Sequence, residues 1–428
     1  MAIRILHTAD WHFGKTLEGR ERISEQKQFV EELGAICDEE KIDLVLVAGD
    51  VFQTVNPSAQ AEELFYSALS LLASGGTRGV VVIAGNHDHP ERIKAAQKVA
   101  DQLGITLLGY PKDSVYPLQI GDGRIEWLEG GAGWLELSVP GCEEHAVIAA
   151  VPYPSEARLN EVMSETLQDD EFQSRYQARI AELFEQLATH FRVDTANIVM
   201  SHLYVGGSIE SDSEVQIQIG GAYAVDKSVF PKNTQYVALG HLHRPQAVHG
   251  ADFPIRYAGS PLAYSFSEAG QQKSVVVVDI TPGAPAVWKE VSLTCGKPLV
   301  KWNATEGIEQ VWSWVEEGRD ANAWIDLSVH VKTGLQLDEI RRLRNMHEGF
   351  IHIRPILPES LASGEVREDE DFSTLSVEDL FKRFFEERLG VVPDDELVEL
   401  FMEMATNLEA EDDLKALSDQ SEELERDQ

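Results

Sequence analysis

A chain of 428 residues with 43% hydrophobic content is long enough to bury two or more cores. None of its apolar runs approaches the roughly 20 residues that a membrane-spanning helix needs, so no such helix is predicted. The formal net charge of -37 argues against a broadly basic nucleic-acid binder. Three widely spaced cysteines, none in a C-x-x-C pair, exclude a disulfide framework and a cysteine-bound zinc.

The first quarter of the chain alternates predicted strands with predicted helices. Short apolar runs typical of buried strands occupy residues 3–6, 44–48 and 80–84. Amphipathic stretches that predict helices occupy about residues 21–40, 59–73 and 91–103. This alternation predicts an α/β fold class. Because the first strand begins at Ile3 and leaves no room for a signal peptide, we expect a cytoplasmic protein.

After Gly104 the pattern becomes shorter and more β-like, and a helix is predicted near residues 173–190. Two further apolar runs, residues 198–200 and 237–239, predict buried strands. The run at residues 274–280 is expected to close this part of the core.

Each of five predicted strands is followed at once by side chains that bind metals. In chain order these side chains are Asp10 and His12, Asp50, Asn86, His87 and Asp88, His202, and His241 and His243. Taken singly, each group also fits a turn or a helix cap. Five such groups in succession favour a metal site, because the carboxyl ends of neighbouring strands meet at one edge of a sheet.

The donor set indicates two divalent ions rather than one structural ion. Two ions held roughly 3.5 to 4 Å apart share a bridging carboxylate, and Asp50 is the natural bridge because its two oxygens can serve two ions. Imidazole, carboxylate and amide donors without any thiolate favour manganese, iron or zinc. The share of oxygen donors fits Mn²⁺ best, with Mg²⁺, Fe²⁺ and Zn²⁺ as alternatives.

A second domain is predicted after the proline-rich stretch at residues 282–285. We expect a principal domain at residues 1–285, a small α+β domain at 286–357, a linker with two helices at 358–410, and an acidic tail at 411–428. The pattern of residues in the second domain predicts the order strand, strand, helix, strand, helix, strand. The helix pair carries apolar residues at helical spacing, and its stripe needs either a partner or its own chain to cover it.

The succession Asp-x-His, Gly-Asp, Gly-Asn-His-Asp, His and Gly-His-x-His resembles that of the calcineurin-like metallophosphoesterases. Longer segments are similar to the SbcD family, the nuclease subunits of bacterial SbcCD complexes and relatives of the Mre-type repair nucleases. These segments are residues 7–14, 48–52, 206–221, 236–246 and 257–262. The resemblance runs from residue 2 to about residue 410. It implies a sandwich of β-sheets flanked by helices, a small capping domain and a C-terminal helix pair.

The resemblance also implies a role for each candidate residue. The first ion would be held by Asp10, His12, Asp50 and His243, and the second by Asp50, Asn86, His202 and His241. His87 would then remain unligated and would stabilise the transition state or protonate the leaving group. Asp88, beside it, would hold its imidazole in one tautomer.

By the same resemblance the reaction is phosphodiester hydrolysis in DNA repair and recombination, with attack by a metal-bound hydroxide. The expected activities are a 3′ to 5′ exonuclease on double-stranded ends and an endonuclease on single strands or hairpins. The resemblance also implies a heterotetramer of two SbcC-type ATPase subunits and two nuclease subunits, with the nuclease homodimer formed by the helices after the second and third motifs. Because this chain lacks a P-loop of its own, any ATP dependence must come from such a partner. The residues expected to dock on SbcC are Leu380, Phe381, Phe384, Phe385, Leu397, Leu400 and Phe401.

The distribution of charge along the chain weakens the argument against DNA binding. Residues 365–428 contain 23 acidic and 6 basic residues, so much of the negative charge lies in a segment that need not touch DNA. Lys15, Arg20 and Arg244 lie close to metal-ligand motifs and are the candidate DNA contacts, although a solvated surface explains them equally well. The excess of acidic residues also fits a cytoplasm of high salt concentration.

Two other functions remain open from sequence. A phosphatase or cyclic-nucleotide phosphodiesterase would use the same metals on small substrates, but would not require the capping domain and the helix pair. A catalytically idle scaffold for a repair ATPase would be favoured by a missing ligand, and no ligand is missing.

Overall fold

The computed structural model describes residues 2–161, 169–214, 223–332, 334–358, 376–389, 393, 397–398 and 401–402. The chain divides into two compact units, Met1–Leu299 and Val300–Gln428. Each unit is described separately.

The first unit contains a six-stranded sheet in which four neighbouring strands are parallel. Its strands, in spatial order, are β14 (Val287–Ser292), β13 (Ser274–Ile280), β1 (Ile3–Thr8), β2 (Leu44–Ala48), β3 (Gly79–Ile83) and β4 (Ile105–Leu108). The strands from β1 to β4 run parallel, whereas β13 is antiparallel to β1, with Ile3 opposite Ile280. The predicted strands at the start of the chain therefore form one sheet.

The second sheet has eight strands. In spatial order they are β11 (Gln246–Val248), β12 (Ile255–Tyr257), β10 (Tyr236–Gly240), β9 (Thr195–His202), β8 (His145–Val151), β7 (Trp134–Ser138), β6 (Glu126–Gly131) and β5 (Leu118–Gln119). The central strands β8, β9 and β10 are parallel, with Ser201 opposite Leu239. Both β9 and β10 therefore present their carboxyl ends at the same edge.

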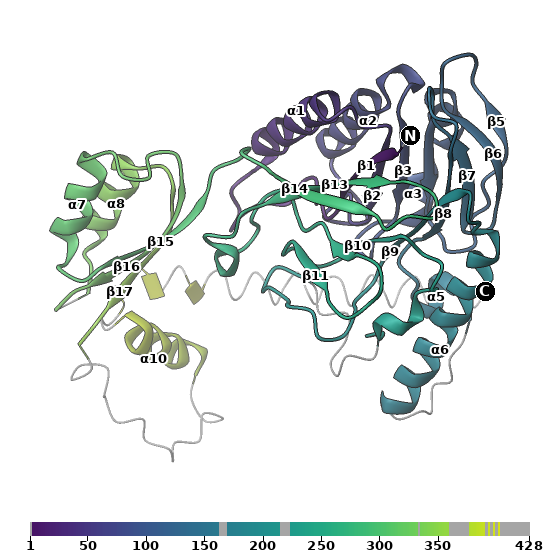
Figure 1. Ribbon diagram of the computed structural model, residues 1–428. Helices are drawn as coiled ribbons and strands as arrows, with labels where there is room; N and C mark the ends of the chain where they lie inside the picture. The colour runs from purple at the N-terminus through teal and green to yellow at the C-terminus, as the bar shows by residue number, and fades with distance from the viewer. Residues whose placement is uncertain are drawn as a thin grey trace, which may run out of the picture. The chain divides into compact units, whose positions relative to one another are not determined.

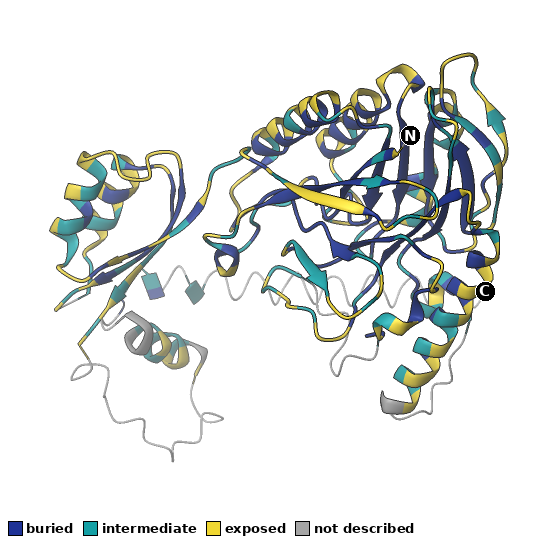
Figure 2. Cartoon of the chain, in the orientation of Figure 1, coloured by how far each residue is buried: buried dark blue, intermediate teal, exposed yellow. Residues whose placement is uncertain are grey.

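The two sheets pack face to face, because alternate side chains of their strands point in opposite directions. On β2, Leu44 and Leu46 belong to the core shared with the second sheet, whereas Val45 and Val47 belong to the core under helices α1 (Ile23–Glu39) and α2 (Ala59–Ala73). The far face of the second sheet packs on α6 (Asp169–Leu187). Figure 1 shows α1 and α2 side by side on the outside of the first sheet. In Figure 2 the buried strands lie between α1 and α2 on one side and α6 on the other.

The remaining helices of this unit are short. They are α3 (Pro90–Lys94), α4 (Gln97–Ala100), α5 (Glu156–Leu159), and the 3-10 turns η1 (Ser74–Gly76), η2 (Asp101–Leu103), η3 (Ala188–His190), η4 (Lys227–Val229) and η5 (Phe266–Glu268). The predicted helix at about residues 91–103 is thus divided into α3, α4 and η2. Its apolar periodicity could not reveal these breaks.

Residues 299–356 form a three-stranded sheet with two helices in the second unit. Its elements are β15 (Leu299–Ala304), α7 (Ile308–Glu316), β16 (Trp324–His330), α8 (Leu337–Met346) and β17 (Phe350–Ile356). The sheet order is β15-β16-β17, and β16 runs parallel to β17. Trp302, Leu327 and Phe350 are buried with Val311 of α7 and Leu343 of α8. This small core gives the unit an apolar centre of its own.

The structure divides the chain later than the predicted boundary after residue 285. Strand β14 pairs antiparallel with β13, so that Val287 lies opposite Asp279 in the first sheet. The division instead falls between Leu299 and Val300. The prolines at residues 282 and 285 mark the turn between β13 and β14 rather than a division between units.

Helix α10 (Val377–Leu389) is one of the two helices predicted within residues 358–410, and the Oγ of Ser376 accepts a hydrogen bond from the Asp379 N–H at 3.1 Å. Phe381 stacks on Phe401 with ring centroids 3.9 Å apart, while 57% of Phe384 is exposed. Leu400, residues 359–375 of the predicted linker and the predicted tail at 411–428 lie outside the described residues.

Within the described part of the chain, no helix combines the length and the apolar character that crossing a bilayer requires.

Candidate metal centre

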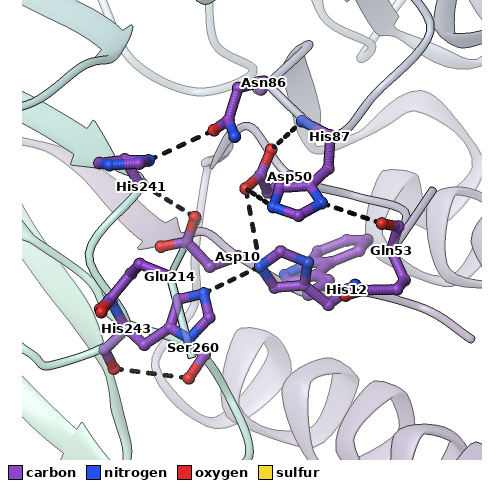
Figure 3. Close-up of polar contacts among 12 residues, drawn as sticks. Asp10, His12, Asp50, Gln53, Asn86, His87, Glu214, His241, His243 and Ser260 are labelled. Atoms are coloured by element: carbon purple, nitrogen blue, oxygen red, sulfur yellow. Dashed lines mark hydrogen bonds and ion pairs between the residues drawn. The ribbon is translucent and has the colours of Figure 1, made fainter. Parts of the chain in front are cut away.

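The seven predicted ligands meet where strands of both sheets end; Figure 3 labels six of them, and His202 lies beside Asn86 and Asp50. Asp10 and His12 follow β1, Asp50 follows β2, Asn86 follows β3, His202 ends β9, and His241 and His243 follow β10. Six of these seven side chains are buried, and Asn86 is half-buried. The sandwich therefore brings together donors that lie up to 233 residues apart in sequence.

Glycines before the ligands allow the strand ends to approach one another closely. A Cβ on Gly85 would lie 2.1 Å from Asp50 Oδ1, and a Cβ on Gly240 would lie 1.9 Å from the carbonyl oxygen of Ala48. Asp10, His12 and Asp50 themselves have positive φ angles of 54°, 46° and 50°. Backbone strain of this kind persists where the surrounding fold enforces it, and it is common at functional sites.

The carboxylate of Asp50 lies between two groups of donors. Its Oδ2 lies 3.6 Å from His12 Nε2, whereas its Oδ1 lies 3.5 Å from His202 Nε2. On the first side, His12 Nε2 is 2.9 Å from His243 Nε2. On the second side, Asn86 Oδ1 is 2.8 Å from His202 Nε2. Asp50 therefore has the position that a bridging carboxylate requires.

The ligand histidines are held in the neutral form that binds metals. Burial lowers the pKa of His202 and His243, and it lowers the pKa of His241 to about 3. His202 Nδ1 donates to the carbonyl oxygen of Ala48 at 2.9 Å, which directs the lone pair of Nε2 toward Asp50 and Asn86. Neutral imidazoles with a fixed tautomer are suited to metal binding.

Two buried polar atoms of this centre lack a hydrogen-bond partner among the described residues, namely Asp10 Oδ2 and His12 Nδ1. Burial, followed by the neighbouring carboxylate of Asp50, raises the pKa of Asp10 well above its ordinary value. Two carboxylates buried side by side are costly without a compensating positive charge. The oxygen and nitrogen donors present therefore fit divalent cations.

His87 lies beside the centre with its Nε2 3.9 Å from Asp50 Oδ2. Its Nδ1 donates to the carbonyl oxygen of Gln53 at 2.9 Å, so Nε2 is the nitrogen that faces the ligands. Its ring packs edge-on against His12, with centroids 4.8 Å apart. A histidine in this position can contact a substrate bound at the centre.

The predicted contact between Asp88 and the His87 imidazole is wrong. Asp88 Oδ1 accepts from the backbone N–H of Phe52 at 2.9 Å, and Oδ2 accepts from those of Gly85 and Val51 at 2.8 and 3.1 Å. The carboxylate is fully buried and ties the loop after β3 to the loop after β2. Asp88 therefore positions backbone, and the Gln53 carbonyl takes the role predicted for it.

Arg158 of α5 is a residue that the sequence analysis missed. Its Nη1 and Nη2 donate to the carbonyl oxygens of Gly85 and Asp88, both at 2.6 Å, so that the guanidinium spans the turn carrying Asn86 and His87. No local motif marks this arginine, because its partners lie about 70 residues earlier in the chain.

The three candidate DNA contacts differ in their surroundings. Lys15 Nζ donates to the carbonyl oxygen of Ser213 at 3.1 Å and lies 5.2 Å from the ring centroid of Tyr264. Lys15 is thus part of the wall beside the centre, whereas Arg20 and Arg244 are exposed. DNA contact by these residues stays a prediction.

Comparisons with known proteins agree with this geometry. Residues 3–245 match the calcineurin-like phosphoesterase family, and residues 295–388 match the type 5 capsule protein repressor C-terminal domain. The SbcD subunit of the SbcCD nuclease from Bacillus subtilis (strain 168) is 49% identical over 411 residues, which cover 96% of this chain and 100% of that protein. The chain belongs to the SbcD family of calcineurin-like phosphoesterases. This membership confirms the predicted family and fold class.

Two further SbcD proteins, which carry the same name as the Bacillus subtilis relative, resemble this chain. The protein from Rhodobacter capsulatus is 36% identical over 66% of this chain and 67% of its own length. The protein from Staphylococcus epidermidis is 25% identical over 93% of this chain and 98% of its own length. The likeness to SbcD relatives thus extends over both units. As a metallophosphoesterase of this family, the chain is expected to bind divalent metal ions, in agreement with the donor set.

Proposed function

We propose that this chain is the nuclease subunit of an SbcCD-type complex, a two-metal phosphodiesterase that acts on DNA. The observation that carries the proposal is the position of Asp50, whose two oxygens face two separate groups of donors. The proposed activities are 3′ to 5′ exonuclease action on double-stranded ends and endonuclease action on single strands or hairpins. Mn²⁺ is the proposed metal, because oxygen donors accompany the imidazoles.

The proposed ligand sets assign Asp10, His12, Asp50 and His243 to one ion, and Asp50, Asn86, His202 and His241 to the other. When bound, two such ions neutralise the non-bridging phosphate oxygens and lower the pKa of an attacking water. The protein itself orients these donors through the strand ends and the loops that follow them.

His87 is the proposed proton donor to the leaving 3′ oxygen. Its Nδ1 proton is committed to the Gln53 carbonyl, so only Nε2 can exchange a proton with a substrate. This nitrogen lies 3.9 Å from Asp50 Oδ2, next to the proposed bridging carboxylate. Protonation matters here because an alkoxide is a poor leaving group.

The proposed partners follow from the exposed apolar surfaces. In α10, 57% of Phe384 and 36% of Leu380 are exposed, which supports docking of the helix pair on an SbcC-type ATPase. In α2, 40% of Tyr66 and 45% of Leu71 are exposed, which supports a homodimer through this helix. The small second unit is proposed to act as a capping domain that positions DNA.

The test is cleavage of linear duplex DNA by the purified chain with Mn²⁺, with one duplex labelled at its 3′ ends and another at its 5′ ends. We expect early release of 3′-labelled nucleotides and progressive shortening of 5′-labelled strands, both abolished by EDTA. Intact DNA, with and without an added SbcC-type ATPase, together with hydrolysis of bis(p-nitrophenyl) phosphate would indicate a small-substrate phosphodiesterase instead.

Mn²⁺ is expected to stabilise the first unit against heat. Asp10 and Asp50 are buried close together, and binding of divalent cations by the two carboxylates would offset the cost of burying them. Mn²⁺ at 100 times its Kd contributes about 2.7 kcal/mol per site. Differential scanning calorimetry with MnCl₂ or EDTA should therefore give a higher Tm with Mn²⁺. Equal values of Tm would contradict metal binding.

Replacing Arg158 with glutamine is expected to slow DNA cleavage by about 10- to 100-fold, because the turn carrying Asn86 and His87 loses its two guanidinium contacts. Single-turnover rates at saturating Mn²⁺ measure the effect. Arg179→Gln is the matched control, since Arg179 makes a comparable two-nitrogen contact with Glu161 away from the centre. Equal rates for the two variants would show that Arg158 does not act on the turn.

A further inference from the structure

Three hydrogen-bonded polar residues, two of them buried, lie behind His243, outside the ligand set. They are Ser213, in the loop after β9, Glu268, at the end of η5, and Lys273, just before β13. Glu268 is fully buried, and Lys273 is 7% exposed. Buried charges are rare unless they are paired, so an arrangement of this kind calls for an explanation.

Hydrogen bonds connect the three residues to the imidazole in sequence. His243 Nδ1 lies 2.5 Å from Ser213 Oγ, and Ser213 Oγ lies 2.6 Å from Glu268 Oε1. Lys273 Nζ donates to Glu268 Oε2 at 2.5 Å and to the carbonyl oxygen of His243 at 2.8 Å. The backbone N–H of His243 donates to Glu214 Oε1 at 2.6 Å. Hydrogen bonds from residues outside the ligand set therefore hold both the side chain and the backbone of His243.

Counting donors fixes the tautomer of His243. An ionised Glu268 can only accept, so the proton of the Ser213 hydroxyl points to Glu268. The Ser213 oxygen is then left to accept, and His243 Nδ1 must be the donor. The lone pair of His243 consequently lies on Nε2, the nitrogen that faces His12. If the Ser213 hydroxyl donated to His243 Nδ1 instead, a lone pair of the Ser213 oxygen would face a lone pair of Glu268 Oε1.

We propose that Glu268, acting through Ser213, is a positioning residue that holds His243 with its Nε2 lone pair directed at the first metal, while Lys273 balances the buried charge of Glu268. This inference rests on the two-metal centre of the proposed function. It assigns the loop after β9 a part in metal binding, because this loop supplies both Ser213 and Glu214.

Glu268 also caps the turn in which it lies, accepting from the N–H groups of Tyr264 and Ser265 at 3.1 Å each. A purely structural role must therefore be separated from positioning. Ser265→Ala removes the other half of the same capping box, in which Ser265 Oγ accepts from Ser267 N, and it does not touch His243. Ser213→Ala removes the hydroxyl that connects His243 to Glu268, and it leaves the capping box intact.

The test measures Mn²⁺ binding to the full chain by isothermal titration calorimetry in five proteins: wild type, S213A, S213T, E268Q and S265A. We expect two Mn²⁺ per wild-type chain. S213A and E268Q should weaken one of the two sites by about 10- to 100-fold and leave the other unchanged. S213T, which keeps the hydroxyl, and S265A should resemble the wild type. Excess Mn²⁺ should restore the DNA cleavage rate of S213A.

The proposal is overturned if S213A binds both ions as tightly as the wild type does, or if S265A weakens the same site as much. Should E268Q fail to fold, S213A alone decides between these outcomes. A wild-type chain that binds no Mn²⁺ would overturn the two-metal centre itself, which is a different result from unchanged affinity in S213A.

Discussion

Replacing Asp50 with asparagine is expected to abolish DNA cleavage and to leave at most one weakly bound Mn²⁺ per chain. Asp50 is the side chain whose two oxygens face both groups of donors, and an amide offers only one oxygen. Removing a residue that hydrogen-bonds to a metal ligand typically lowers metal affinity or activity by about 10- to 100-fold. Loss of the bridging carboxylate itself should therefore exceed that range. Calorimetric titration with MnCl₂ and single-turnover cleavage measure the two effects.

Asp194→Asn is the matched control for this substitution, because it removes one carboxylate charge from the surface, where Asp194 pairs with Arg192. We expect this control to bind two Mn²⁺ and to cleave at the wild-type rate. Two tightly bound ions in the Asp50 variant would mean that another carboxylate provides the bridge, and Asp10 would then be the next residue to replace.

The second large effect is expected for His87→Asn. The asparagine amide can still donate to the Gln53 carbonyl, but it cannot replace the proton donor at Nε2. General acid catalysis contributes roughly 10²- to 10⁴-fold, so kcat on DNA should fall within that range while Mn²⁺ binding persists. The loss should be much smaller on bis(p-nitrophenyl) phosphate, because nitrophenolate departs without protonation.

His89→Asn provides the matched comparison, since His89 is an exposed histidine two residues further along the same turn. Its DNA cleavage rate should equal that of the wild type. Equal losses on both substrates in the His87 variant would argue against proton donation and in favour of transition-state stabilisation by the imidazole.

The cluster of donor side chains could be predicted because its members lie at or close to the carboxyl ends of strands whose apolar residues are consecutive in sequence. Asp10, Asp50 and His202 each follow or end such a run, and the rule that strand ends share an edge places them together. The strand order could not be obtained in this way, because the pairing of β1 with β13 joins residues more than 260 positions apart.

Side chains that act through long-range contacts gave no signal in the sequence. Arg158 and Glu268 lie in stretches without a motif, and their roles depend on which backbone the fold brings near them. Asp88 was found but misinterpreted, since adjacency to His87 in sequence does not bring their side chains into contact. Its carboxylate turns instead toward three backbone N–H groups.

The closure of the first sheet by β13 also bears on how the enzyme is made. Ribosomes add roughly 5 to 20 residues per second, so the amino-terminal strands emerge well before β13, which ends at Ile280. Until residue 241 has been added, a nascent chain contains Asp10 and Asp50 but lacks His241 and His243. A product of translation interrupted before residue 241 therefore carries only part of the donor set, and all seven donors are present only in chains that extend to His243 or beyond.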